Sequence, residues 1–186
     1  MSTPGTYTVG CEYLVASNIV TGVASALATQ SLAGAVNRTV VVPGVQVAWD
    51  NCDCGQLALV VPRHYTSRDF PIDTSTLKTG NCDNTYVVAD MYLSLVRCVP
   101  GPDEDGNPPT VTDLNRAAEV SFGDMWIMRQ TLTCLLRTYY ESPPVAGLRI
   151  AEWLVTDDVG LGALGGCAGR ELHFKVAWWA DCGCGD

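Results

Sequence analysis

The chain has 186 residues and a mass of 19.9 kDa, the size of one globular domain, so we expect a single domain over residues 1–186. Its apolar content of 47% and mean hydropathy of +0.13 exclude disorder for most of the chain. Eleven Lys and Arg residues against twenty Asp and Glu residues give a net charge of −9, which is the wrong sign for binding phosphates. These values exclude a conventional nucleic-acid-binding protein.

The sequence carries no signal for membrane insertion or secretion. No segment approaches the roughly 18 unbroken apolar residues of a spanning helix. The first residues, MSTPGTYTVGCEYL, lack the positively charged and apolar regions of a signal peptide. We therefore expect a protein that is made and kept in the cytosol, without a membrane span.

The first third of the chain predicts a helix followed by two strands. Residues 11–36 repeat apolar side chains at spacings of three and four, which predicts a helix that Gly34 stops. The segment TVVVPGVQVAWD predicts a strand with a bend at Pro43-Gly44, and QLALVVPRHY predicts a second. We expect these strands, near 40–50 and 56–65, to pair as a hairpin whose loop carries Cys52 and Cys54.

The middle of the chain predicts one strand between two loops. Residues 66–83 show no period and are rich in Thr, Ser, Asp and Gly, so they predict a long exposed loop. From Tyr86 to Val99 apolar residues alternate with polar ones, with Leu93 on the apolar parity and Arg97 as its exception. Residues 100–109, PGPDEDGNPP, predict a charged loop that tolerates no regular element.

A long helix should follow, from a start at Thr112 and Asp113 to an end at Pro143. Gly123 predicts a bend or a close contact in its middle. The apolar stripe that we expect to face the core consists of Leu114, Ala117, Ala118, Met125, Trp126, Met128, Leu132, Leu135, Leu136 and Tyr139. The tail predicts strands around 148–158 and 169–182, joined by a glycine-rich turn over 160–169.

The predicted order is α-β-β-β-α-β-β. Strands adjacent in sequence usually pair, so the simplest architecture is an α+β domain with a mostly antiparallel sheet and two helices packed on one face.

Catalytic signals are weak, and we expect a protein that is not an enzyme. The two histidines, His64 and His173, lie in strand-like segments, and no G-x-S-x-G motif accompanies them. The glycine run at 160–169 lacks the G-K-[ST] ending of a phosphate loop. The acidic residues at 103–105 lack the register of a calcium loop, so we interpret them as a solvated tip that contacts a partner.

Nine cysteines leave at least one unpaired within the chain. Three alternatives stay open for two C-x-C pairs: a tetrahedral structural zinc, disulfides formed late, or free thiols. The residues of these pairs are Cys52, Cys54, Cys182 and Cys184. We expect Cys11, Cys134 and Cys167 to be core residues.

The five tryptophans fit either a core or an interface. Adjacent residues on a strand face opposite ways, so one of Trp178 and Trp179 needs cover from outside its own core, for which an oligomeric interface is a natural place.

Several segments together resemble one viral family. They are VAWDNCDCGQLALVVPRHYTSRDFP, the strand ending LVRCVP, the acidic Pro-rich loop, PPTVTDLNRAAEVSFGDMWIMRQTLTCLL and GGCAGRELHFKVAW. They look like the small head-to-tail connector proteins of long-tailed phages that infect actinobacteria. Within that group, the element order and size are most similar to the tail terminators.

The resemblance implies a structural virion protein, made in the host cytoplasm and located at the head-proximal end of the tail. Such a protein forms a homo-hexameric ring on the major tail tube protein, ends tube polymerisation and offers a docking surface for the head-to-tail stopper. An acidic lumen would let genomic DNA pass without specific binding. The family implies no cofactor and no membrane contact. Our interface candidates are Arg68, Asp69, Asp103, Glu104, Asp105 and Trp179.

Three alternatives remain. The chain could be a head-to-tail stopper or adaptor of the same connector. It could be a zinc-stabilised cytosolic binding module that uses the two C-x-C pairs. A small hydrolase or oxidoreductase has only scattered histidines and cysteines in its favour.

Overall fold

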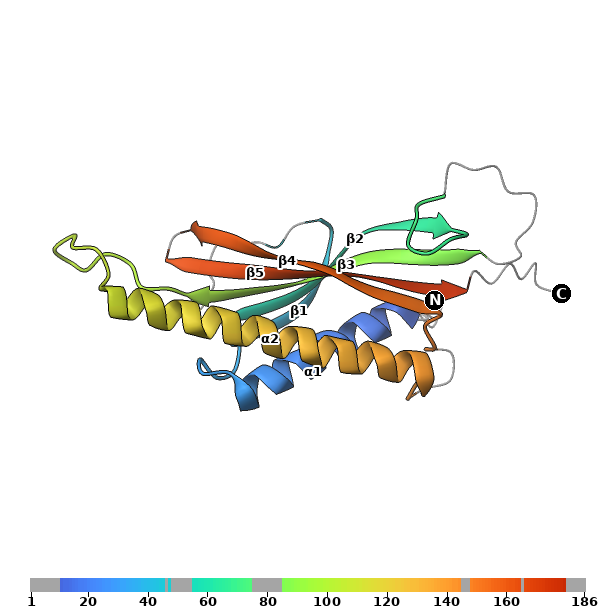
Figure 1. Cartoon of the computed structure of the whole chain (residues 1–186), viewed down its shortest axis with the longest axis horizontal. Coiled ribbons are helices and arrows are strands. Elements are labelled where there is room, and N and C mark those ends of the chain that lie inside the picture. The colour runs from blue at the N-terminus through green and yellow to red at the C-terminus, as the bar shows by residue number, and fades with distance from the viewer. Residues whose placement is uncertain are drawn as a thin grey trace, which may run out of the picture.

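A computed structural model of the chain describes residues 11–45, 47, 55–74, 85–144, 148–164 and 166–179. Seven elements occur in this part, in the predicted order. The helices are α1 (Cys11–Gln30) and α2 (Val111–Glu141), and the strands are β1 (Arg38–Pro43), β2 (Gln56–Ser67), β3 (Tyr86–Cys98), β4 (Glu152–Leu164) and β5 (Cys167–Trp179). Figure 1 shows one twisted sheet with both helices on the same face, which confirms the predicted α+β class.

The sheet has the strand order β1-β2-β3-β5-β4, so β3 lies at its centre. β3 pairs antiparallel with both neighbours, and Leu93 lies opposite Leu59 on β2 and Leu172 on β5. All three leucines are fully buried beneath the helices. The alternation from Tyr86 to Val99 therefore predicted the strand and the face that lies beneath the helices, although Val87 at its start is exposed.

The expected hairpin between the first two strands is wrong. β1 pairs with β2 in parallel, with Arg38 opposite Gln56 and Pro43 opposite Val61. A hairpin needs a short turn, whereas about a dozen residues separate Pro43 from Gln56, which is the length that a parallel crossover requires. β1 therefore forms one open edge of the sheet, and β4 forms the other.

Each helix covers one half of the sheet. α1 contacts β1 and β2, while α2 contacts β4 and β5. The helices approach each other at Gly22, where an added Cβ would lie 2.9 Å from Cδ1 of Leu135. Gly22 thus allows the close contact that we had expected at Gly123, which has open space around it and lies within the continuous α2.

The ends of α2 follow its capping chemistry. Thr110 is the N-cap, and its Oγ1 accepts a hydrogen bond of 3.2 Å from the backbone N–H of Asp113. The helix therefore begins at Val111, slightly before the predicted start. It ends at Glu141, just ahead of Pro143, as predicted.

The last two strands have other bounds than predicted: β4 extends further, β5 begins earlier, and residues 180–182 of the predicted last strand lie outside the described residues. β4 runs through Gly160 and Gly162 to Leu164, and β5 begins at Cys167. The glycine-rich segment is therefore mostly strand, and the connection is confined to residues 165–166, where Gly166 has a φ of 82°. Residues 148–151 precede β4 rather than belong to it.

Within the part of the chain that the structure describes, neither helix has the length and apolar character needed to cross a bilayer.

Candidate functional site

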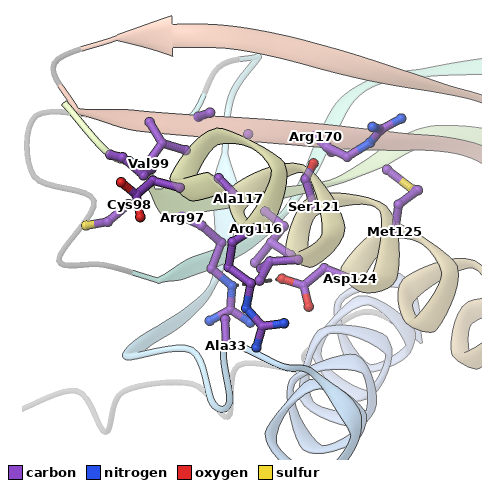
Figure 2. A pocket seen from close by; sticks show the side chains of 16 residues that line it. Ala33, Arg97, Cys98, Val99, Arg116, Ala117, Ser121, Asp124, Met125 and Arg170 are labelled. Atoms are coloured by element: carbon purple, nitrogen blue, oxygen red, sulfur yellow. Dashed lines mark hydrogen bonds and ion pairs between the residues drawn. The ribbon is translucent and has the colours of Figure 1, made fainter. Parts of the chain in front are cut away.

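A buried ion pair joins the centre of the sheet to α2. Nε of Arg97 on β3 donates to Oδ2 of Asp124 over 2.9 Å, with side chains only 10% and 3% exposed. Figure 2 shows the two side chains pointing toward each other between the sheet and the helix. Arg97, the exception on the apolar parity of its strand, is thus buried because a carboxylate faces it.

Arg97 also holds the segment that follows α1. Its Nη1 donates to the backbone carbonyl of Ala35 over 3.1 Å, and its Nη2 donates to that of Gly34 over 2.9 Å. Gly34 has a φ of 72°, a conformation that glycine adopts at no steric cost. One guanidinium therefore ties β3, α2 and the α1–β1 connection together.

A cavity of about 290 Å³ borders this ion pair. Most of its lining is apolar, including Leu95, Val99 and Met125. Oδ1 of Asp124 has no hydrogen-bond partner in the described part of the chain. The lining includes Ser121 but no histidine, so it holds no nucleophile with an imidazole base. The ion pair beside the cavity stabilises the fold.

α2 carries an exposed apolar surface on its outer side. Phe122 is 66% exposed and Trp126 is 62% exposed, one helical turn apart. Val111 and Leu114 are also exposed near the start of the helix. We call these four residues the α2 flank.

The α2 flank corrects part of the predicted core stripe. Met125, Met128 and Leu132 are buried as expected, but Leu114, Ala118 and Trp126 are exposed. The side of α2 that is buried includes fewer residues than the predicted apolar stripe. The first turns of the helix also extend beyond the ends of the strands in Figure 1. The sheet therefore leaves apolar side chains of this helix uncovered.

The opposite face of the sheet carries a charged cluster. Asp90 on β3 accepts hydrogen bonds from Nζ of Lys175 and from Nε of Arg63, the latter over 2.6 Å. Burial acts to raise the pKa of Asp90, but the hydrogen bonds and charges of Lys175 and Arg63 outweigh it and hold that pKa below its ordinary value. Asp90 is therefore a charged, stabilising partner at neutral pH.

The two histidines lie on different strands and have different partners. His64 on β2 pairs with Oε1 of Glu12 at the start of α1. His173 on β5 stacks on Tyr92 with ring centroids 5.2 Å apart and lies 3.4 Å from the carboxylate of Glu171. The prediction that both histidines lie in strands is confirmed.

The acidic tip at residues 103–105 is exposed and internally ordered. The carboxylate of Asp103 accepts the backbone N–H groups of Asp105 and Asn107 over 3.0 and 2.8 Å. The side-chain hydrogen bond from Asn107 is the main cause that lowers the pKa of Asp103, and the hydrogen bond from the backbone N–H of Asn107 lowers it further. Glu104 and Asp105 extend into solvent. The tip holds its shape through its own turn.

The other predicted interface residues lie at the opposite end of the sheet. Arg68 and Asp69 are exposed in the turn after β2. Trp179 is 59% exposed and packs its ring 4.6 Å from that of Tyr86, which is paired with Ser67. The structure thus brings Trp179 near the Arg68 turn and separates both from the acidic tip. Residues 75–83 of the predicted loop lie outside the described residues.

The Trp178-Trp179 pair behaves as predicted. Trp178 packs against the main core beneath the helices, while Trp179 points to the other face.

The structure describes some of the cysteines and leaves the two C-x-C pairs outside the described residues. Cys52, Cys54, Cys182 and Cys184 lie outside the described residues, so the zinc, disulfide and thiol alternatives for them stay predictions. The described residues contain no cluster of three or more His, Cys, Asp or Glu side chains that could hold a metal. Cys98 and Cys167 are both disulfide-bonded, which the sequence analysis did not anticipate.

The expectation of core cysteines is correct for one position and wrong for another. Cys167 is buried as expected. Cys134 is an exposed free thiol, because its position on α2 lies away from the sheet. The side chain of Cys11 lies outside the described residues.

Two features escaped the sequence analysis although signals existed. Arg97 on an apolar parity was a signal for a buried partner, but nothing in the sequence singled out Asp124. Phe122 and Trp126 have the i,i+4 spacing of one helix face, yet Trp126 was grouped with the core.

Neither the family models nor the curated proteins compared with this sequence match it.

Proposed function

We propose that this chain is an assembly protein of a virus particle. More particularly, we propose a tail terminator, which forms a homo-hexameric ring at the head-proximal end of a phage tail and has no enzymatic role. The resemblance of its segments to connector proteins of actinobacteriophages supports this function. The compact α+β fold, with a long helix and two open sheet edges, is suited to building a ring.

The observation that carries the proposal is the α2 flank. An exposed Trp and an exposed Phe, one turn apart, give an apolar surface that a solitary acidic domain has little reason to keep. Aromatic residues are enriched in protein interfaces, where each offers a large contact area. The flank is therefore a surface for another protein subunit.

The remaining partners follow from charge and shape. The major tail tube protein would bind one face of the ring, and the head-to-tail stopper would bind the other. The acidic tip at residues 103–105 and the turn at Arg68 and Asp69 lie at opposite ends of the subunit, so each can reach a different neighbouring ring. The net charge of −9 per subunit would let genomic DNA pass without specific binding. No cofactor is needed for this role.

Electron microscopy of tails assembled without the protein tests the proposal. Loss of a terminator should give tails of irregular, excessive length that do not attach to heads. Loss of a stopper or adaptor should instead give tails of uniform length that fail to join heads. Uniform, head-attached tails in the absence of the protein would contradict all three connector roles.

Native mass spectrometry of the purified chain separates the proposal from the zinc-stabilised binding module. A metal-free hexamer is the result expected of a terminator. A monomer that carries one zinc, and whose melting temperature falls when a chelator is added, would favour the module that uses Cys52, Cys54, Cys182 and Cys184.

A further inference from the structure

A second surface without charged residues lies at the other edge of the subunit. α1 and the edge strand β1 line an open surface hollow of about 400 Å³. Its lining residues, all uncharged, are Tyr13, Ser17, Val20, Thr21, Ala24, Thr39, Val40 and Val41. We call it the α1–β1 hollow. Small side chains along one side of α1 leave the space that larger ones would fill.

α1 is depleted of charge over its whole surface. Glu12 is the one charged residue among the 20 of this helix, whereas 17% of the whole chain is charged. The exposed positions of α1 include Tyr13, Asn18 and Thr21. A solvent-facing helix usually carries several charges, and loss of charge marks the centre of protein interfaces. The helix therefore has the surface chemistry of a covered element.

The α2 flank and the α1–β1 hollow lie at opposite edges of one subunit. Leu135 of α2 faces Gly22 of α1, which fixes the inner side of α2. On the other side of α2, Phe122 contacts the guanidinium of Arg170 on β5 at 5.1 Å. The flank thus lies on the β4–β5 side and the hollow on the β1 side, as the order of the sheet requires.

We propose that the α2 flank of one copy packs into the α1–β1 hollow of a second copy. This inference rests on the proposed ring and names the surfaces that would build it. Each copy offers one projecting surface and one receiving surface, so the contact is head-to-tail, and it builds a ring when the rotation between successive copies closes. A flank that packed on another flank would make a two-fold dimer instead.

The sizes of the two surfaces agree with this pairing. The exposed parts of Phe122 and Trp126 amount to roughly 250 Å², about a third of the area that each partner buries in a stable interface. Val111 and Leu114 on the flank and Tyr13 at the hollow extend the contact. No charged residue of the hollow lining would lose its hydration when the aromatic rings enter.

Two substitutions at exposed positions test the contact. Trp126→Glu places a charge on the flank, and Thr21→Arg fills the hollow with a long charged side chain. Thr138→Glu on α2 and Gln30→Arg on α1 are matched controls, because both positions are exposed and neither belongs to the α2 flank or to the lining of the α1–β1 hollow. Circular dichroism and melting curves check that every variant is folded.

The decisive measurement is native mass spectrometry of each variant and of their mixture. The wild type and the controls should be oligomeric, and each test variant alone should be monomeric. Mixed in equal amounts, the two test variants should form a 1:1 heterodimer that grows no further, since one supplies an intact hollow and the other an intact flank. Oligomers that survive both substitutions, or a Thr21→Arg chain that still forms a dimer through its flank, would overturn the inference.

A wild-type chain that stays monomeric at about 1 mM would also overturn it. Tail length in particles that lack the protein reports on the terminator role separately. Overlong tails together with variants that still form rings would reject the contact and leave the function in place. Uniform tails together with the 1:1 heterodimer would reject the function and leave the contact.

Discussion

Arg97 and Asp124 meet 27 residues apart in the chain, at the point where β3, α2 and the segment after α1 converge. The guanidinium also donates hydrogen bonds to the carbonyls of Gly34 and Ala35. Because both charges are buried, each compensates the other for the loss of water. The pair therefore fixes where the N-terminal half of α2 rests.

Removing one partner of this pair should be costly. We expect Arg97→Ala or Asp124→Ala to lower the free energy of unfolding by about 3 to 5 kcal/mol, because each leaves an uncompensated buried charge. The double replacement Arg97→Met with Asp124→Leu should cost much less. Urea denaturation of the three variants measures these losses. A double variant that loses as much free energy of unfolding as the two single variants together would show that the charges are not coupled.

Leu93 lies at the centre of the sheet between two other buried leucines. Leu93→Ala should lower the free energy of unfolding by about 2 to 5 kcal/mol, because it leaves a cavity beneath both helices. The exposed Leu114→Ala is the control and should change it by less than about 1 kcal/mol. An unchanged melting temperature for Leu93→Ala would contradict its placement in the core.

Asp90 should make stability depend on pH. Its pKa in the folded chain lies below the ordinary value of 3.8, so its stabilisation is complete above that pH and is lost as the pH falls through the folded pKa. Asp90→Asn should therefore melt at a lower temperature than the wild type at pH 7, with a difference that shrinks below pH 3.8. Asp69→Asn, at an exposed site, is the control. A difference that is the same at pH 7 and pH 2 would count against this role.

The thiol of Cys134 should react in the native protein. It is free and exposed on α2, whereas Cys98 and Cys167 are disulfide-bonded. A maleimide should label Cys134 within minutes without denaturant, and it should label Cys98 and Cys167 only after reduction. Peptide mass mapping locates the label. Protection of Cys134 in the assembled oligomer but not in the monomer would add α2 surface to the interface.

The acidic tip should be dispensable for folding. Deletion of residues 102–107 removes a turn whose hydrogen bonds are internal, so the free energy of unfolding should change by less than about 1 kcal/mol, or roughly 2 to 4 °C in melting temperature. Assembly onto tails should be impaired if the tip contacts a neighbouring ring. Loss of a cooperative melting transition would contradict the first expectation.

Local patterns predicted the elements better than their partners. The alternation in β3 and the stop at Pro143 depend on residues close in sequence, and both were predicted. The start of α2 was predicted slightly late, at Thr112 rather than after the cap at Thr110. The direction of β1 depends on where the chain goes between Pro43 and Gln56, which no periodicity encodes. Parallel and antiparallel neighbours of one apolar strand look alike in sequence.

The candidate site was less predictable because it depends on what is left uncovered. Trp126 has the same spacing relative to Met125 and Met128 whether or not a sheet lies over it. Its exposure depends on which side of α2 rests on the sheet, which is a property of the whole fold. The charge depletion of α1 was visible in the sequence, but it gains meaning only beside the hollow at β1.

Because β5 lies between β3 and β4 in the sheet, β3 lacks one of its two neighbouring strands during much of synthesis. β3 leaves the ribosome long before β5, its second partner strand. Cys98 on β3 lies opposite Cys167 on β5 in the strand register, and the whole of α2 is translated between them. Until then, the strand that becomes the centre of the sheet is an open edge that carries buried-type leucines. The nascent chain must therefore keep this edge shielded until the β4–β5 hairpin arrives, and a cell that slows translation after α2 would prolong the interval in which the protein is most prone to aggregate.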